Sequence, residues 1–231
     1  LRADYSHFLV DYDASRNKFR DRIDNSVAGY AFYKFFPKTA AFVQYRFITI
    51  EYDKSTLSNS NEQHFLGGLQ WDITAKSRGN IRAGYGIKNF TGSDLGRNKE
   101  FIMEAEIDHT FTPKTSIRLM GSRRTNETNI STTDFIISDS VGLEYRQRLT
   151  SKISGSLKFA FVLDTYKGDL TFGGETKQRR DNLYSAGVAL QYELKEWLKI
   201  DTGYMCNRRD SNFADFDYTN NVVFFRIAGS L

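Results

Sequence analysis

Three histidines and one cluster of aspartates are the residues of this sequence that could carry chemistry. His7, His64 and His109 are far apart, and none lies in the HExxH spacing of a zinc hydrolase. His109 could serve as the base of a histidine–serine hydrolase, which requires a serine on the adjacent strand. The register expected for that strand pair places Leu119 there instead. The sequence therefore favours a structural histidine and predicts no catalytic residue.

The aspartates lie in "DSNFADFD", which contains Asp210, Asp215 and Asp217. Spaced carboxylates can bind Ca²⁺, but this spacing is not that of a calcium-binding loop, so a solvated acidic loop is the favoured interpretation. The single cysteine, Cys206, cannot form an internal disulfide. We expect neither a metal nor a cofactor.

A short repeat sets the spacing of the elements that position these residues. The stretch "FTPKTSIRL" (111–119) resembles "FFPKTAAFV" (35–43), and weaker copies surround three other lysines. The lysines occupy positions 38, 76, 114, 152 and 195, so the first four are 38 residues apart. A repeat of this length predicts one supersecondary unit per period.

Apolar and polar residues alternate between these lysines. In "FIMEAEIDHTF" (101–111), apolar side chains and His109 occupy the odd positions, whereas Glu104, Glu106 and Asp108 occupy even ones. A period of two predicts β-strands with one apolar and one polar face. Twelve strands are expected, near residues 2–13, 24–36, 40–53, 62–74, 79–90, 99–112, 116–127, 133–149, 153–166, 178–194, 197–208 and 217–231.

The connections alternate between tight lysine-centred turns and longer polar loops such as 54–62, 91–98 and 166–178. This asymmetry is typical of an outer-membrane barrel, with short periplasmic turns and long outer loops. The sequence thus predicts a single all-β domain over residues 1–231, an antiparallel transmembrane up-and-down β-barrel of about twelve strands in the bacterial outer membrane. A soluble β-sandwich is the alternative, but it would have to bury aromatic residues from every strand in one core. The formal net charge of +4 does not suggest a nucleic-acid partner.

Folding each hairpin about its lysine predicts charge pairs across the strands. Glu104 is expected opposite Arg124, and Glu144 opposite Lys158. The same procedure places Arg46 opposite Tyr30, and Arg82 near Asp108. The polar face therefore carries a ladder of opposite charges.

The side chains that alternate onto the polar face of the strands are predicted to line the lumen of the barrel. It comprises Arg46, Arg82, Lys88, Glu104, Glu106, Asp108, Arg118, Arg124, Glu144, Arg146, Lys158, Asp164, Lys199 and Asp201. Over all inward positions, basic side chains outnumber acidic ones, which would favour anions inside. Twelve strands leave an opening of roughly 10 Å or less after side chains are added, which suits an extended sugar chain.

Two motifs carry a family resemblance. "FTPKTSIRL" and the ending "SNFADFDYTNNVVFFRIAGSL" (211–231) resemble the putative β-barrel porin type 2 group of outer-membrane proteins. The resemblance implies a channel, and because such proteins are commonly encoded with exopolysaccharide export genes, it implies a conduit for a polysaccharide. It supplies no catalytic motif. The sequence departs from the family pattern in two ways. It ends in Leu231, where outer-membrane proteins usually have an aromatic residue. Family members are also longer, so strands preceding Leu1 are expected.

The implied partners are outer-membrane lipid, lipopolysaccharide, a polysaccharide substrate and periplasmic export proteins. The basic stretches 122–127 and 177–181 fall where strands meet long loops, either as a solvated rim or in contact with lipid phosphates. Two alternatives to export remain: a general small-solute porin, and a plugged structural or adhesive barrel. The inward Phe32, Phe42, Ile48 and Ile50 favour the plugged barrel.

Overall fold

Twelve antiparallel strands follow one another in a single sheet, in the order β1 to β12, with β1 and β12 at the ends of that order. The computed structural model describes residues 1–54, 59–74, 76–91, 97–128, 133 and 135–229. The strands are β1 (Arg2–Val10), β2 (Arg22–Phe36), β3 (Thr39–Tyr52), β4 (Ser60–Thr74), β5 (Ser77–Phe90), β6 (Arg97–Thr112), β7 (Thr115–Asn126), β8 (Phe135–Arg148), β9 (Ile153–Phe172), β10 (Glu175–Lys195), β11 (Leu198–Ser211) and β12 (Tyr218–Gly229). Among the described residues, the short 3₁₀ helices η1 (Ser15–Arg20) and η3 (Ala214–Phe216) lie between β1 and β2 and between β11 and β12. Within the described residues, no helix is both long and apolar enough to cross a membrane.

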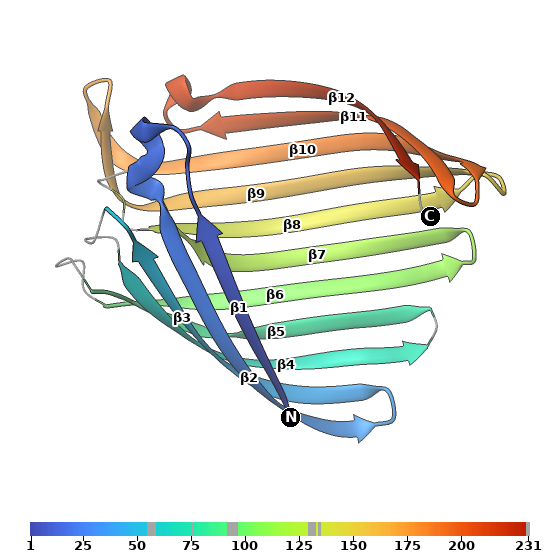
Figure 1. The fold of residues 1–231 in the computed structure, drawn as a ribbon, viewed down its shortest axis with the longest axis horizontal. Helices are drawn as coiled ribbons and strands as arrows, with labels where there is room; N and C mark the ends of the chain where they lie inside the picture. Colours follow the sequence, from blue (N-terminus) through green and yellow to red (C-terminus); the bar gives the residue numbers. More distant parts are fainter. Residues whose placement is uncertain (55–58, 75, 92–96, 129–132, 134, 230–231) are drawn as a thin grey trace. The chain divides into compact units, whose positions relative to one another are not determined.

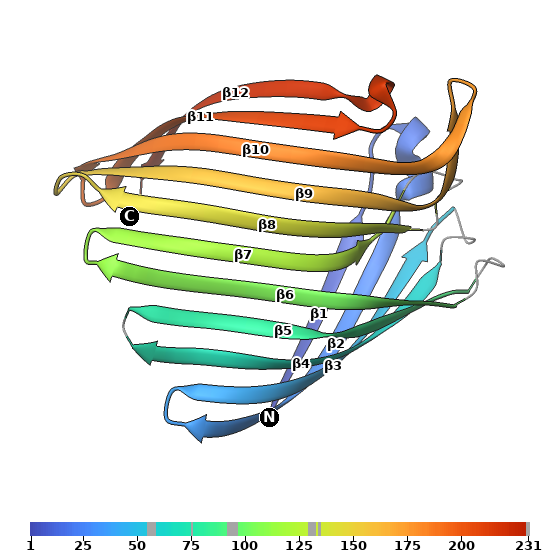
Figure 2. The same ribbon diagram turned by 180° about the vertical axis from the view of Figure 1, so that it is seen from behind.

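The predicted up-and-down arrangement of twelve strands is confirmed, and one predicted loop is wrong. Residues 166–178 continue β9 and β10 as a long hairpin, visible at the end of these strands away from the tight turns (Figure 2). Gly173 and Gly174 form its tip with φ of 61° and 83°. Two consecutive positive φ angles allow a two-residue turn between strands, so Gly173 and Gly174 close a hairpin within the stretch that was predicted to be a loop.

The lysine-centred breaks are tight turns. Strand β6 ends at Thr112 and β7 begins at Thr115, leaving only Pro113 and Lys114 between them. The Thr112 hydroxyl accepts a hydrogen bond from the Lys114 backbone N–H at 3.2 Å, which holds the turn. The last turn is formed by Glu196 and Trp197 rather than being centred on Lys195.

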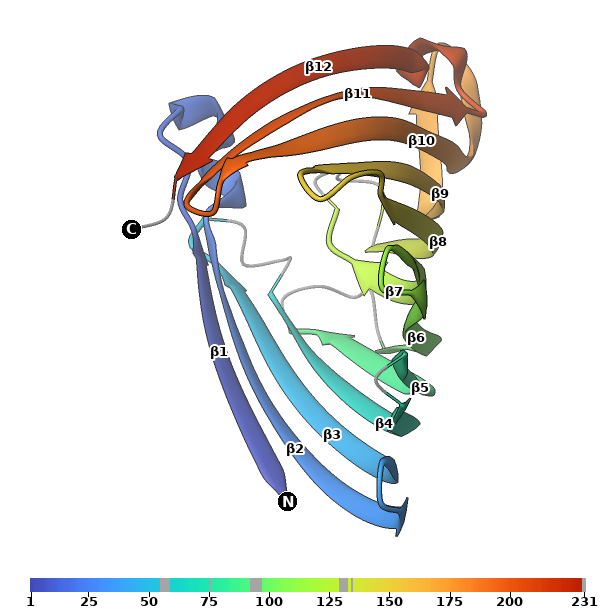
Figure 3. The ribbon, with the colours of Figure 1, turned by 90° about the vertical axis from the view of Figure 1, so that its right-hand side faces the viewer.

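The contacts divide the chain into two compact units. The first consists of Leu1–Trp71 and Asn80–Met103. In it, β1 pairs with β2, β2 with β3, and β3 with β4, all antiparallel (Figure 3). The second unit consists of Asp72–Gly79 and Glu104–Leu231. In it, β7 to β12 pair in sequence, and the tight turns of β6–β7, β8–β9 and β10–β11 share one end (Figure 1).

Polar side chains are buried and apolar side chains are exposed, the reverse of the pattern in the sheet of a soluble protein. On β3, Gln44 is only 2% exposed, whereas its neighbour Val43 is 63% exposed. In the second unit, Glu144 and Asp201 are buried, whereas Val141 and Val188 are exposed. We call the side that carries Gln44 and Glu144 the polar face, and the side that carries Val43, Val141 and Val188 the apolar face. An exposed apolar band opposite a buried polar face is the pattern of a sheet that faces lipid.

Candidate conduit surface

The polar face of the second unit carries the predicted charge ladder. Arg124 Nε lies 3.2 Å from Glu104 Oε1, and Lys158 Nζ lies 3.5 Å from Glu144 Oε1. Glu144 and Lys158 are direct partners across β8 and β9, as folding about Lys152 predicts. Glu144 also accepts a hydrogen bond from Arg146 Nε at 2.8 Å. The sequence predicted these pairs because a strand period of two fixes which charges can meet.

The ladder continues towards the turns and along β11. Arg118 Nε donates to Asp108 Oδ1 at 2.7 Å and lies 3.4 Å from Glu106 Oε1. Arg78 Nε donates to the other oxygen of Asp108 at 3.2 Å, a contact that the sequence did not suggest. The remaining pairs are Lys199 with Glu193 at 3.1 Å and Asp201 with Arg226 at 2.7 Å.

One predicted pairing in the first unit is wrong. Arg46 lies opposite Ala28, and Tyr30 lies opposite Gln44. The turn is centred between Pro37 and Lys38, and the register shifts once more between Lys34 and Phe36, so the partners move by two residues. A shift of two keeps every side chain on its face, and Arg46 therefore still belongs to the polar face.

A buried ion pair, missed at the sequence level, lies on the polar face of the first unit. Lys88 Nζ lies 2.8 Å from Glu62 Oε1, and both side chains are nearly inaccessible. His64 Nε2 lies 3.0 Å from the second oxygen of Glu62. Glu62, His64 and Lys88 all have even numbers in neighbouring strands. The alternation of side chains along a strand could therefore have predicted that they share a face.

Three arginines and three aromatic rings line a pocket of about 290 Å³ on the polar face of the first unit. We call it the arginine pocket; its lining is Arg2, Asp4, Tyr30, Phe32, Phe42, Arg46, Gln70, Asn80 and Arg82. Arg82 Nη1 donates a hydrogen bond to Gln44 Oε1 at 3.0 Å.

The aromatic rings of the arginine pocket form one cluster. The ring centroids of Phe32 and Tyr30 are 6.0 Å apart, and those of Phe32 and Phe42 are 5.5 Å apart. The guanidinium carbon of Arg2 lies 5.3 Å from the centroid of Tyr30. Guanidinium groups recognise carboxylate or sulfate oxygens, and flat rings offer an apolar surface to a sugar ring.

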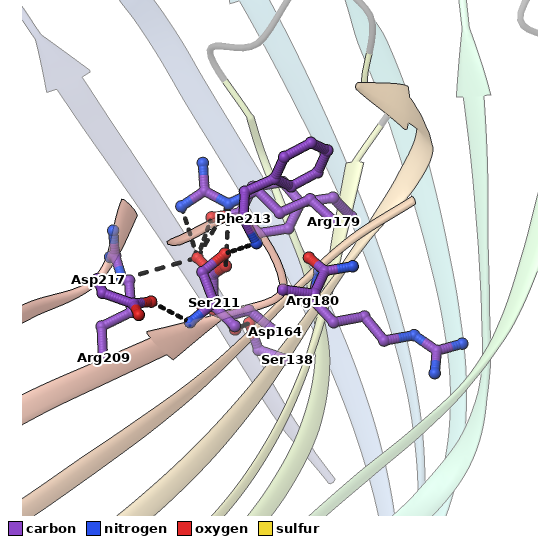
Figure 4. A network of polar contacts seen from close by, with 11 residues as sticks. Ser138, Asp164, Arg179, Arg180, Arg209, Ser211, Phe213 and Asp217 are labelled. Carbon is purple, nitrogen blue, oxygen red and sulfur yellow. Dashed lines mark hydrogen bonds and ion pairs between the residues drawn. The ribbon is translucent and has the colours of Figure 1, made fainter. Parts of the chain in front are cut away.

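A second polar network is centred on Asp181, at the end of β10 away from the turns. Asp181 is fully buried. Arg179 Nη2 donates to its Oδ2 at 2.6 Å, and Ser211 Oγ donates to its Oδ1 at 2.7 Å. Arg179, Arg209 and Ser211 converge there, while Arg180 points away from the network (Figure 4). This network joins β10 to β11 on the polar face.

Aromatic rings and hydroxyl groups extend the Asp181 network. The Arg179 guanidinium carbon lies 3.9 Å from the Phe216 ring centroid and 4.6 Å from that of Tyr166. Asp164, one of the predicted lining residues, is the cross-strand partner of Asp181 and accepts a hydrogen bond from the Ser138 hydroxyl. The network is too densely paired to be an open site.

The hairpin tip beyond the network is also held in place. Lys177 Nζ donates to Glu175 Oε2 at 2.6 Å, and this hydrogen bond lowers the pKa of the Glu175 carboxyl. The Lys177 ammonium also lies 4.6 Å from the centroid of the Phe213 ring.

His7, His109 and Asp217, which were weighed for other chemistry, have structural partners. The rings of His109 and Phe111 meet edge to face, with centroids 4.6 Å apart. His7 Nδ1 lies 2.8 Å from Asn25 Oδ1. Asp217 Oδ1 accepts the backbone N–H of Ser211 at 2.6 Å. Within the described residues, no three His, Cys, Asp or Glu side chains are grouped to hold a metal ion.

A family model described as "Putative beta-barrel porin 2" matches residues 2–229. The chain belongs to this family. It is accordingly an outer-membrane β-barrel protein of the porin type. The resemblance seen in the two sequence motifs is therefore confirmed over nearly the whole of this porin-family chain.

Solved structures of several outer-membrane proteins are similar to this porin-family chain. A NanC porin is 10% identical, with 99% of each chain covered and a TM-score of 0.39. A loop-deletion variant of OmpT, an outer-membrane protein of Vibrio cholerae, is 11% identical with 98% of each chain covered and a TM-score of 0.41. The outer-membrane phospholipase A of Escherichia coli is 12% identical, covers 98% of this chain and 88% of its own, and has a TM-score of 0.36. Among curated proteins, no sequence matches the chain.

Proposed function

We propose that this porin-family protein is a conduit for exporting an acidic exopolysaccharide across the outer membrane. The observation that carries the proposal is the arginine pocket, where Arg2, Arg46 and Arg82 lie beside Tyr30, Phe32 and Phe42 on the polar face. A polysaccharide made of uronic acids offers carboxylates to the arginines and flat ring faces to the aromatic side chains. The large inward Phe32 and Phe42, which suggested a plugged barrel, are then part of a sugar-binding surface.

The charge ladder suits passage rather than tight binding. Its acids and bases largely neutralise one another, as in the pairs Glu104–Arg124 and Glu144–Lys158. A chain sliding past such a surface exchanges weak polar contacts, each worth about 0.2–1 kcal/mol, without being trapped. The function requires no nucleophile, so we propose a protein without enzymatic activity. A general small-solute porin is the second candidate, since the same ladder would admit ions and small solutes.

Titration with defined oligosaccharides tests the proposal. A uronic-acid oligomer should bind the purified protein more tightly than a neutral glucose oligomer of equal length. Replacing Arg46 and Arg82 together with glutamine should weaken acidic-oligomer binding by about tenfold or more, because charge-assisted hydrogen bonds are lost. The same variant should reduce surface polysaccharide in a complemented deletion strain.

Lys114 and Lys152 provide the matched control, because both lie in tight turns. Replacing them with glutamine removes the same charge and should leave binding and export unchanged. Equal affinity for the acidic and neutral oligomers would contradict the acidic-polysaccharide assignment and leave the small-solute porin as the better account.

A further inference from the structure

Charged side chains line a pocket on the apolar face of the second unit. Its volume is about 440 Å³, and its lining comes from β7, β8, β9 and β10. We call it the rim pocket; it is formed by Arg123, Ile137, Asp139, Leu163, Thr165, Lys167, Arg180 and Asn182. A charged residue on the lipid side of a barrel costs about 2–4 kcal/mol at mid-membrane but little near the interface. The depth of the pocket therefore decides what it can do.

Strand register fixes that depth. Arg123, Asp139 and Leu163 are consecutive cross-strand partners. Two residues closer to the tight turns, Val141 lies opposite Phe161, which lies opposite Tyr184. The rings of Phe161 and Tyr184 are 5.2 Å apart, and Tyr184 and Val141 are exposed on the apolar face.

This order of side chains is that of a membrane interface. Tyrosine is enriched where acyl chains give way to headgroups. The rim pocket begins two residues beyond the Phe161–Tyr184 pair, on the side of the long hairpin, and so lies at the level of lipid phosphates.

The cations of the rim pocket exceed its acids. Arg123 Nη1 donates to both oxygens of Asp139 at 2.8 Å, so this pair is satisfied. Lys167 and Arg180 are the other two basic side chains of the lining, and Asp139 is its only carboxylate. The pocket therefore has a net positive charge on an otherwise apolar surface.

Arg180 is the residue most available to a ligand. Its backbone is fixed, because its N–H donates to Asn212 Oδ1 at 2.9 Å and its carbonyl accepts the Asn212 N–H at 3.0 Å. Its exposed guanidinium has neither a hydrogen bond nor an ion pair within the described part of the chain, and it points away from the Asp181 network (Figure 4). A rigidly mounted, unpaired guanidinium at headgroup depth is suited to a phosphate group.

We propose that the rim pocket binds a phosphate group of lipid A, the phosphorylated glycolipid of the outer leaflet. The phosphate accepts hydrogen bonds from Arg180, Lys167 adds positive charge to the same pocket, and the acyl chains lie along Val141, Phe161 and Tyr184. Basic pockets on membrane proteins bind anionic headgroups in this manner. The assignment requires the long hairpin to face the cell exterior, and it is independent of what the conduit transports.

Native mass spectrometry of the detergent-purified protein tests the assignment. The probes are bisphosphorylated lipid A, its dephosphorylated form, phosphatidylglycerol and inorganic phosphate. Bisphosphorylated lipid A should bind best, and replacing Lys167 and Arg180 together with glutamine should weaken that binding about tenfold or more. Replacing Arg180 alone should produce part of the loss, and because its side chain has no described partner, this variant should fold like the wild type.

The control is again the pair Lys114→Gln and Lys152→Gln, which removes equal charge at the turn end. It should retain full lipid A binding. Unchanged binding in both rim-pocket variants would overturn the proposal, as would an equal loss in the turn-end control. Equal affinity for phosphatidylglycerol or for dephosphorylated lipid A would also overturn it, because the pocket would then not recognise the lipid A phosphate.

Discussion

Leu157 of β9 lies directly opposite Val188 of β10, and both side chains are exposed on the apolar face. Their chain neighbours Ser156 and Ala189 also lie opposite each other, but on the polar face. One residue along either strand thus moves from the exposed apolar face to the polar face.

That one-residue step predicts a sharp difference in tolerance to charge. Arginine at Leu157 or Val188 should destabilise the folded protein by about 2–4 kcal/mol, because a guanidinium must enter lipid. Arginine at Ser156 or Ala189 should cost far less. Urea unfolding in lipid vesicles measures both sets, and equal losses would mean that the two faces do not differ in environment.

The buried Glu62–Lys88 pair predicts a second difference. Replacing Lys88 with methionine leaves the Glu62 carboxylate buried without the positive charge of its ion-pair partner. This should destabilise the protein by about 3–5 kcal/mol. The double variant Lys88→Met with Glu62→Gln removes both charges and should recover part of that loss. If the double variant is as unstable as the sum of the two single variants, the pair does not act as a unit in the unfolding equilibrium.

The sequence predicted these faces but not their finer contacts. Alternation identified twelve strands and placed Glu144 opposite Lys158, because parity and a short turn leave few possible registers. It misplaced Arg46 by two residues, since the irregularity beside Phe35 depends on local backbone geometry. It placed residues 166–178 in a loop and could not show that β9 and β10 continue to Gly173 and Gly174. The buried pairing of Glu62 with Lys88, and the gathering of arginines in one pocket, depend on several strands meeting and have no local sequence pattern.

Orientation can be read from cysteine labelling. With Cys206 changed to alanine, a cysteine at Glu175 in the long hairpin should react with an impermeant reagent in intact cells, because this hairpin lies at the end opposite the tight turns, and bacterial barrels keep their short turns in the periplasm. A cysteine at Ser151, in a tight turn, should react only after the outer membrane is opened. Gly173 is less suitable for substitution because its φ of 61° disfavours other residues. The opposite labelling pattern would show that the tight turns face outwards.

The Asp181 network predicts a local loss of order at the outer ends of β10 and β11. Changing Asp181 to alanine leaves Arg179 buried without its ion-pair partner and should cost about 3–5 kcal/mol. Amide exchange should rise in residues 178–182 and 208–212, while the turn end near Leu190 and Thr202 stays protected. The exposed pair Arg208–Asp210 is the control: Asp210→Ala should cost less than about 1 kcal/mol. Uniform exchange over both strands in the Asp181 variant would contradict a local role.

If the polar face lines an open conduit that prefers anions, the protein should carry an anion current across a planar lipid bilayer. The wild-type protein under a potassium chloride gradient should conduct, with a reversal potential on the anion-selective side. Replacing Arg46 and Arg82 together with glutamate should shift that potential towards cations without breaking the Glu104–Arg124 and Glu144–Lys158 pairs, and the Lys114→Gln, Lys152→Gln control should leave it unchanged. A folded wild-type protein that conducts no current, or that prefers cations, would contradict the account.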